Sequence, residues 1–270
     1  MNVSIIGCGK IGMLISDGIK RGEAGETTLI SAFDRHADRA ALVAARTRAQ
    51  VATSIQDILR NPRVELVVEA ASITAVRELG PRILHAGKDL LILSSGALLL
   101  RPLLKNLLSV ARQRGVKIYV PSGAAAGMDA IKAGRVSGLT SVSVELRKTP
   151  GSWKEFMKDF GGKKIDRGRR QPITLVESKV DELVSSSPGM FNSVAAISLA
   201  GAGPIKTAVR VVRDPSLARN VTRIHAVTKS WEVLVESRND WSAKILEGTL
   251  TVSSVLSKLR DLSGPLEVGS

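Results

Sequence analysis

The stretch GCGKIG near the start of the chain constrains its fold more than any other feature. Its glycines, at positions 7, 9 and 12, follow the short apolar run at residues 3–6, and apolar residues recur at helical spacing over residues 11–19. This pattern predicts a buried strand, a tight turn and a helix. A G-x-G-x-x-G turn in that setting is typical of dinucleotide binding, because the missing side chains let the backbone approach a pyrophosphate at the positive end of the helix.

A carboxylate after the second predicted strand supports this interpretation. Residues 28–33 are typical of a strand, and Asp34 follows them, 22 residues after Gly12, where a carboxylate is expected to meet an adenosine ribose. The neighbouring Arg35 suits a 2′-phosphate, so NAD and NADP both stay open as cofactors. A plain turn with a capping aspartate is the alternative. The cofactor contacts predicted in this part of the chain are Gly7, Gly9, Lys10, Ile11, Gly12, Asp34 and Arg35.

Short apolar runs alternate with amphipathic segments over the first 120 or so residues. The predicted strands are residues 3–6, 28–33, 50–52, 66–69, 89–93 and 116–120, and the predicted helices between them include residues 37–45, 73–86 and 101–114. Such alternation predicts an α/β fold, with a doubly wound parallel sheet of the Rossmann type and helices on both faces. A ligand of this fold binds at the carboxyl ends of the strands.

Loops of small residues follow three of these strands at that edge. They are AAS at residues 70–72, SSGA at residues 94–97 and PSGAAAG at residues 121–127. Small residues let a flat nicotinamide approach the backbone, and hydroxyl groups can bond its carboxamide or a substrate carboxylate. An ordinary turn explains any one of these loops, but three at one edge favour a ligand. We therefore expect Ala71, Ser72 and Ser94 to contact the cofactor.

The pattern changes after residue 127. Residues 139–149 alternate between apolar and polar side chains, and further strands are predicted at residues 206–212, 221–227 and 230–235, with a helix at residues 191–199. This predicts a smaller mixed α+β domain whose open sheet serves substrate binding or pairing with a second subunit. The expected domains are residues 1–120 for the dinucleotide, residues 121–245 for substrate and dimerisation, and a C-terminal helical segment, residues 246–270, packing back on the first domain.

Composition limits the classes of partner. The chain has 39 Lys+Arg against 25 Asp+Glu, a formal net charge of +14, which favours anionic partners. It has few aromatic side chains on which nucleic-acid bases could stack, 4 Phe, 3 Trp and 1 Tyr, so we expect no nucleic-acid partner. Glycines and an aspartate interrupt its densest basic run, residues 163–170, so we expect a solvated loop there, with an anion-binding surface as the alternative. Its apolar runs are shorter than a membrane span, and its single cysteine, Cys8, suits a reducing compartment. We expect a cytoplasmic protein without a membrane partner, and its three scattered histidines do not predict a metal site.

Several longer segments occur in a characteristic order along the chain: GCGKIG, VVEAASITAVRELG, ILHAGKDLLILSSGALL, VPSGAAAGMDAIKAG, ELRKTPG, NSVAAISLAG, RDPSLARN and GPLEVGS. Together they resemble the L-aspartate dehydrogenases of archaea and bacteria. The resemblance implies an architecture similar to homoserine dehydrogenase, with a second domain that dimerises. It also implies oxidation of L-aspartate by NAD(P)+ to iminoaspartate, which hydrolyses to oxaloacetate and ammonia or feeds NAD biosynthesis. Carried over by position, it makes Ala124 and Asn192 cofactor contacts.

One position departs from the pattern that the resemblance implies. A catalytic histidine is expected after the D-P…N segment, where this chain has Thr222, and the nearest histidine is His225. In a regular strand the odd offset places these two side chains on opposite faces. Threonine does not ionise near neutral pH, and losing a general base typically costs on the order of 10²–10⁴-fold in rate.

Three interpretations stay open at this point. The first is an aspartate dehydrogenase whose general base is His225, Lys148 or ordered water. The second is a related amino-acid dehydrogenase with a different substrate, and the third is a catalytically weak NAD(P)-binding protein that acts as a sensor or scaffold. All three keep the cofactor site, the first two take a small amino acid or dicarboxylate as substrate, and a homodimer is expected.

Overall fold

The structure is a computed structural model that describes residues 1–152, 171–186, 191–239 and 250–269. The chain divides into two compact units. The first unit consists of Met1–Gly123 and Thr251–Val268, and the second consists mainly of Ala124–Leu250. The basic run at residues 163–170 lies outside the described residues.

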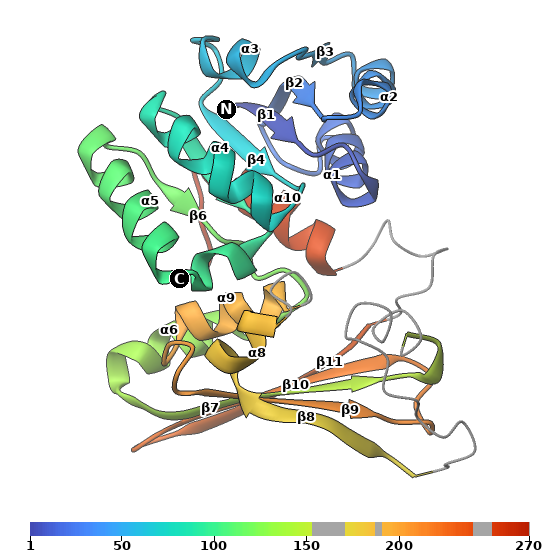
Figure 1. Cartoon of the computed structure of the whole chain (residues 1–270), viewed down its shortest axis with the longest axis vertical. Helices are drawn as coiled ribbons and strands as arrows, with labels where there is room; N and C mark the ends of the chain where they lie inside the picture. Colours follow the sequence, from blue (N-terminus) through green and yellow to red (C-terminus); the bar gives the residue numbers. More distant parts are fainter. Residues whose placement is uncertain (153–170, 187–190, 240–249, 270) are drawn as a thin grey trace. The chain divides into compact units, whose positions relative to one another are not determined.

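Six parallel strands form the sheet of the first unit (Figure 1). They are β1 (Asn2–Ile6), β2 (Thr28–Phe33), β3 (Gln50–Val51), β4 (Leu66–Glu69), β5 (Asp89–Ile92) and β6 (Ile118–Tyr119). The strand order is β3-β2-β1-β4-β5-β6, so the direction of winding reverses between β1 and β4. This confirms the doubly wound parallel sheet predicted from the sequence, and it places the expected ligand crevice at the carboxyl ends of β1 and β4.

Helices cover both faces of this sheet. One face carries α1 (Lys10–Lys20), α2 (Ala37–Thr47) and α10 (Leu250–Ser263), and the other carries α4 (Ile73–His85) and α5 (Arg101–Arg114). Helix α10 belongs to the core of the first unit, because its residues Val252, Val255, Leu256 and Leu259 join the same buried cluster as Ile5 and Ile15. A Cβ atom added at Gly18 of α1 would lie 2.5 Å from Leu256 Cδ1, so the two helices are in close contact.

Two short helices in the first unit were not predicted. They are α3 (Ile55–Leu59) and a 3₁₀ helix, η1 (Ser95–Leu99). The SSGA segment was expected to be a loop, but most of it forms η1. The physical reason is burial: Ala97 and Leu98 are 0% and 3% exposed, and a short helical turn lets both enter the core while it pairs backbone groups locally.

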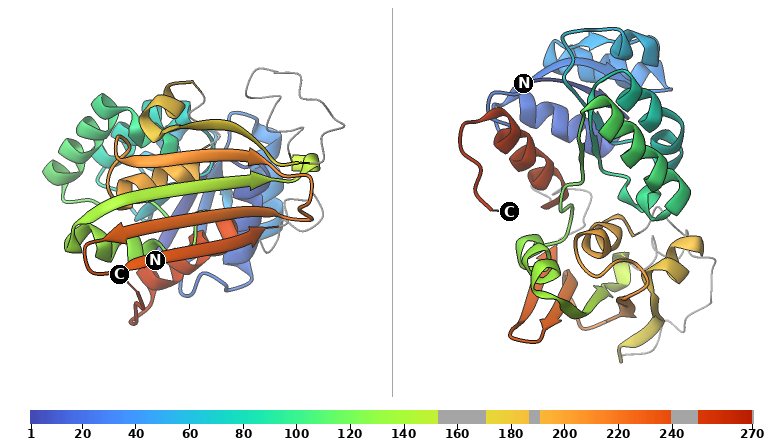
Figure 2. Two further views of the ribbon diagram at one scale, coloured as in Figure 1. Left: turned by 90° about the horizontal axis from the view of Figure 1, so that it is seen from below. Right: turned by 90° about the vertical axis from the view of Figure 1, so that its left-hand side faces the viewer.

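Five strands form the mixed sheet of the second unit. They are β7 (Leu139–Lys148), β8 (Ile173–Lys179), β9 (Thr207–Arg213), β10 (Asn220–Thr228) and β11 (Glu232–Asn239), in the order β11-β10-β7-β9-β8. The pair β7 and β9 is parallel, and the other neighbours are antiparallel. Helices α6 (Met128–Ser137), α8 (Val180–Ser186) and α9 (Asn192–Ala200) lie on one face (Figure 1), and Figure 2 (left) shows the strands from the other face.

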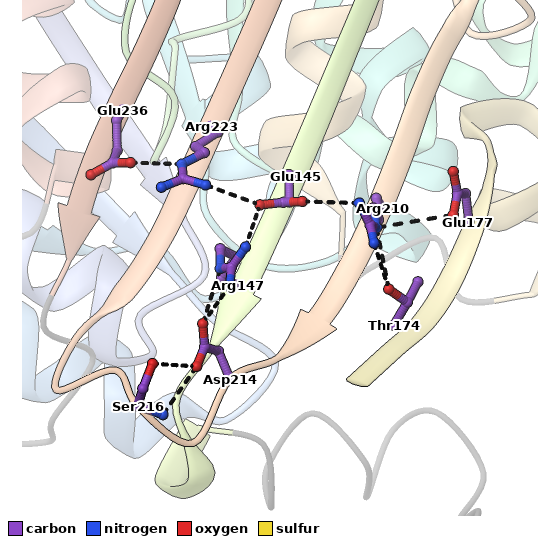
Figure 3. Close-up of polar contacts among 9 residues, drawn as sticks. All are labelled: Glu145, Arg147, Thr174, Glu177, Arg210, Asp214, Ser216, Arg223 and Glu236. Carbon is purple, nitrogen blue, oxygen red and sulfur yellow. Dashed lines mark hydrogen bonds and ion pairs between the residues drawn. The ribbon is translucent and has the colours of Figure 1, made fainter. Parts of the chain in front are cut away.

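The two faces of this second sheet differ sharply in chemistry. The face under the helices, here called the covered face, carries buried apolar residues such as Val144, Leu146, Val211 and Ile224. The opposite, open face carries a row of alternating charges, one from each strand, which we call the charge row (Figure 3). Its members are Glu236, Arg223, Glu145, Arg210 and Glu177, and the nitrogen-to-oxygen distances between neighbours are 2.6, 3.6, 3.6 and 3.9 Å.

Within the described residues, no helix combines the length and apolar character that a membrane crossing needs.

Candidate active site

Each glycine of the glycine loop (residues 7–12) lacks a side chain for a different reason. Gly7 has φ +93, and a Cβ atom there would lie 2.6 Å from the backbone of Ala70. At Gly12 a Cβ atom would lie 1.9 Å from the carbonyl oxygen of Gly7, so this glycine lets α1 pack against its own strand. Gly9 has an ordinary φ of −71, and a Cβ atom there would meet nothing within 4 Å. The middle glycine therefore does not serve packing, and it leaves a space open.

This open space lies at the amino end of α1. Gly9 is the N-cap of the helix, no side chain caps it, and its first turn contains no acidic residue. The backbone N–H groups and the positive end of a helix dipole at such an end favour an anion. The space and the helix end therefore fit the pyrophosphate of a dinucleotide. The predicted contacts Lys10 and Ile11 are the first two residues of α1, with Lys10 exposed and Ile11 partly buried.

Asp34 joins the glycine loop to the end of β2. Its Oδ2 atom accepts a hydrogen bond from the backbone N–H of Cys8 at 2.7 Å, and its Oδ1 atom accepts one from the N–H of His36 at 2.9 Å. These bonds fix the carboxylate beside the glycine loop, where the sequence predicted a ribose contact. The neighbouring Arg35 is exposed.

Cys8, between the first two glycines, is a buried and weakly acidic thiol. Burial, and after it the charge of Asp34, raises the pKa of Cys8 to about 12. The side chain is 1% exposed, and its sulfur lies 3.6 Å from the carbonyl oxygen of Phe33. In the parts of the chain that the structure describes, no three His, Cys, Asp or Glu side chains group together in a way that could hold a metal ion.

Glu69 ties together two of the loops predicted to meet the cofactor. It is the last residue of β4 and is 2% exposed. Its Oε1 atom accepts hydrogen bonds from the N–H groups of Ala71 and Ser72, at 2.8 and 2.9 Å, and from Ser94 Oγ at 2.9 Å. Its Oε2 atom accepts the N–H of Ser94 at 3.0 Å. Burial raises the pKa of Glu69, against the lowering effect of these four hydrogen bonds.

Glu69 was not among the residues predicted from the sequence, although a signal was present. In LVVE a charged residue closes an apolar strand, at the edge where the ligand was expected. The structure also shows that the two predicted serine hydroxyls have structural partners: Ser94 Oγ donates to Glu69, and Ser72 Oγ accepts the N–H of Ala75 as the N-cap of α4. Ala71, which precedes Ser72, is exposed. Contacts of Ala71, Ser72 and Ser94 with the cofactor stay predictions.

The remaining predicted residues lie in the second unit. Ala124 is in the loop at residues 121–127, and Asn192 is the first residue of α9, directly after its N-cap Phe191. Thr222 lies on β10, partly buried, opposite Leu146 of β7 and on the covered face. The roles predicted for these three residues stay predictions.

His225 lies on the open face, so the structure does not bring it together with Thr222. The strand pair β10 and β7 keeps one register from Val221 to Val227, without a bulge that would turn a side chain over. His225 Nε2 lies 3.1 Å from Glu232 Oε2, and its side chain is 42% exposed. These two residues were predicted as alternatives for the catalytic position, and only Thr222 shares the face that the helices cover.

Two family models match this chain, one over its N-terminal part and one over its C-terminal part. The model described as "Homoserine dehydrogenase, NAD binding domain" matches residues 7–121, and the model described as "Aspartate dehydrogenase, C-terminal" matches residues 129–262. The L-aspartate dehydrogenases of Methanocaldococcus jannaschii and Methanosarcina mazei are each 32% identical to the chain, and each alignment covers 100% of both proteins.

Solved structures share the fold over the same length. The aspartate dehydrogenase of Thermotoga maritima has a TM-score of 0.78 at 24% sequence identity, with 100% of this chain and 99% of that chain covered. GenD2 of gentamicin A biosynthesis, solved in complex with NAD, has a TM-score of 0.57 at 13% identity, with 100% and 88% covered. At these identities the likeness shows the fold alone.

Proposed function

This chain belongs to the L-aspartate dehydrogenase family, and from that premise we propose that it oxidises L-aspartate with NAD(P)+ to iminoaspartate, which hydrolyses to oxaloacetate and ammonia. The observation that carries the proposal is the similarity over the full length to L-aspartate dehydrogenases, which includes both units. The open space at Gly9 supports it independently, because that space fits the cofactor that the reaction needs.

The residues of the first unit fit a nicotinamide dinucleotide. Gly9 leaves room for the pyrophosphate at the amino end of α1, and Asp34 is held where it can accept hydrogen bonds from a ribose. Glu69 holds the loops after β4 and β5 together, which shapes the edge that a nicotinamide ring would approach. When bound there, NAD(P)+ accepts the hydride that leaves Cα of the substrate.

We further propose that NAD+ is preferred over NADP+. The carboxylate of Asp34 is held in place by hydrogen bonds from the N–H groups of Cys8 and His36. It therefore cannot turn away from the 2′-phosphate of NADP+, and the two negative charges would repel each other. The exposed Arg35 is the residue that would oppose this preference. Comparing kcat/KM for the two cofactors tests it, and Asp34→Ser is expected to shift the ratio toward NADP+, with Asp38→Ser on the exposed face of α2 as the control.

Thr222 at the expected catalytic position predicts a low rate of aspartate oxidation. Hydride removal from Cα requires an unprotonated amine, and Thr222 can orient water or relay a proton but cannot act as a base near neutral pH. His225 is on the other face of the sheet and bonded to Glu232, so we do not assign it to the reaction. We therefore expect a slow enzyme whose rate of aspartate oxidation rises with pH, because the free amine of the substrate becomes more abundant.

A panel of L-amino acids assayed for NAD(P)+ reduction tests the function. Reduction with aspartate above all others supports the proposal. Activity with a different amino acid would instead identify a related dehydrogenase, and tight NADH binding without turnover of any amino acid would identify a binding protein. Both of these results contradict the proposal.

We also infer a homodimer that forms through the open face. No helix among the described residues of the second unit covers this face, and the members of the charge row are paired with one another, which lowers the cost of covering them. Leu234 of β11, opposite His225, adds a hydrophobic side chain that is 66% exposed. Light scattering is expected to show a dimer that Leu234→Asp dissociates and Leu42→Asp, in the first unit, does not. A monomeric wild-type protein would contradict the inference.

A further inference from the structure

Two positively charged side chains lie at one end of the covered face of the second sheet. Lys148 is the last residue of β7 and Arg213 is the last residue of β9, and the two are paired in register. Both continue the alternation of buried residues on their strands, after Leu146 and Val211, so their side chains start from the same face. Neighbouring strands are about 4.8 Å apart, so these two positive side chains begin next to each other.

The charge of Lys148 has no compensating partner among the described residues. Its side chain is partly buried, and no described acceptor lies within hydrogen-bond distance of its Nζ atom. Asp214, which follows Arg213 and is 2% exposed, is engaged elsewhere: Oδ2 accepts from Arg147 Nη2 at 2.5 Å, and Oδ1 accepts from Ser216 Oγ at 2.6 Å. Burial lowers the pKa of Lys148 below its usual value, because the charged form loses water without gaining an anion.

Polar groups of β10 continue this end of the covered face. Thr222 lies opposite Leu146, two residues before Lys148, and Asn220 lies two residues farther along the same face of β10. Asn220 is fixed, because its Oδ1 accepts the N–H of Thr149 at 3.0 Å and its Nδ2 donates to Ser152 Oγ at 2.9 Å. Across β10, β7 and β9 the side chains at the strand ends therefore place a hydroxyl, an ammonium and a guanidinium group on one face.

An anion would complete this arrangement. An uncompensated, partly buried ammonium group destabilises the folded chain. Without a bound anion, Lys148 therefore does not stabilise the protein, so stability does not explain a lysine at this position. A carboxylate between an ammonium and a guanidinium group accepts charge-assisted hydrogen bonds from both, and guanidinium matches both carboxylate oxygens. The same pair would repel an ammonium group, so it discriminates against amino acids with a basic side chain.

We propose that Lys148 and Arg213 bind a carboxylate of the substrate on the covered face, beside Thr222, and so select dicarboxylic amino acids. This rests on the proposed function for the identity of the substrate, but the site itself is a binding site for a carboxylate and can be tested without turnover. Lys148 acts here as a specificity residue and not as the general base.

Calorimetric titration of the NADH-saturated protein with succinate tests the site directly. Lys148→Met is expected to weaken succinate about 10- to 100-fold, the effect of losing one charge-assisted hydrogen bond, and Lys148→Arg is expected to keep most of the affinity. Lys206→Met, at an exposed lysine just before β9, is the matched control and should leave the affinity unchanged. The affinity for NADH is expected to be the same in all four proteins.

Thermal unfolding separates this role from a structural one. Because Met is similar in length and carries no charge, Lys148→Met is expected to raise Tm while it lowers succinate affinity. A lysine that only stabilised the sheet would show a lower Tm in the variant.

The outcomes distinguish this proposal from the proposed function. Unchanged succinate affinity in Lys148→Met, or no succinate binding by the wild-type protein, overturns the carboxylate site. Lys148-dependent succinate binding in a protein that does not oxidise aspartate supports the site and contradicts the proposed function. A KM for aspartate that rises in Lys148→Met with kcat nearly unchanged supports both.

Discussion

Replacing Gly9 by valine tests cofactor binding with little effect on folding, because Gly9 is the one glycine of its loop whose missing side chain leaves open space. A Cβ atom at Gly9 would meet nothing within 4 Å, and its φ of −71 suits any residue. Valine is a poorer N-cap than glycine, which costs α1 up to about 1 kcal/mol, or a Tm decrease of about 2–4 °C for a chain of this size. The variant is therefore expected to fold.

The cofactor is expected to bind much more weakly to this variant. The valine side chain would fill the space through which a pyrophosphate reaches the N–H groups at the amino end of α1. Each charge-assisted hydrogen bond lost there is worth about 1.5–3 kcal/mol. Since 1.4 kcal/mol is a factor of ten, loss of one such bond raises the Kd for NADH by about 10- to 100-fold. Fluorescence titration with NADH measures the Kd, and thermal unfolding of the same samples measures Tm.

Gly12→Ala is the matched contrast. Its Cβ atom would lie 1.9 Å from the carbonyl oxygen of Gly7, so this smaller change must shift the backbone. Overpacking of this kind costs about 1–3 kcal/mol, and we expect a larger loss of Tm than in Gly9→Val. An unchanged Kd for NADH in Gly9→Val would refute the assignment of the open space to the phosphates. A loss of Tm in Gly9→Val as large as in Gly12→Ala would show that the space is not open.

Three other changes test other parts of the site. Glu69→Ala leaves the buried N–H group of Ser94 without its acceptor, while the N–H groups of the exposed Ala71 and Ser72 can bond water instead, so urea unfolding should show a loss of about 1–3 kcal/mol; no loss would mean that water replaces the carboxylate at Ser94 as well. Thr222→His is expected to raise kcat/KM for aspartate on the order of 10²-fold, and no gain at unchanged NADH affinity would argue against a catalytic position there. Cys8 should not react with a thiol reagent at about pH 8 unless the protein is unfolded, because its pKa is raised to about 12. The raised pKa also makes a contribution to stability that is complete below the unfolded value of 9.0 and is lost as the pH rises toward 12, so Cys8→Ala should lessen the fall in Tm over that range.

The first unit could be predicted from the sequence because its signals are local. The glycine loop, the strands and the helices between them each show their own pattern over a few residues, and Asp34 lies at the expected spacing from Gly12. The carboxylate of Glu69 was missed for the opposite reason. Its role depends on Ser94, 25 residues away, and the charged residue that closes LVVE does not by itself identify that partner.

The second unit was harder to predict because its site depends on strand pairing. The alternation of β7 and β10 indicated which side chains share a face, and it correctly separated Thr222 from His225. It did not indicate that β9 pairs with β7 in parallel, which is what brings Arg213 beside Lys148 across 65 positions of the chain. Strand β8 was also missed, since the alternation of apolar and polar residues in ITLVESK breaks at Leu175 and Val176, where its pairing with β9 shifts register.

The place of α10 in the first unit has a consequence for how the protein is made. The cofactor-binding unit takes its core from both sides of the second unit in the sequence, with Leu256 and Leu259 beside Ile15 and Ile19. Domains generally fold as units during synthesis, the N-terminal one first, but this one stays incomplete on the ribosome until the whole intervening unit has been translated. A nascent chain stalled after β11 would therefore display an intact glycine loop on an unfinished core, and it would expose to chaperones the apolar surface that α10 later covers.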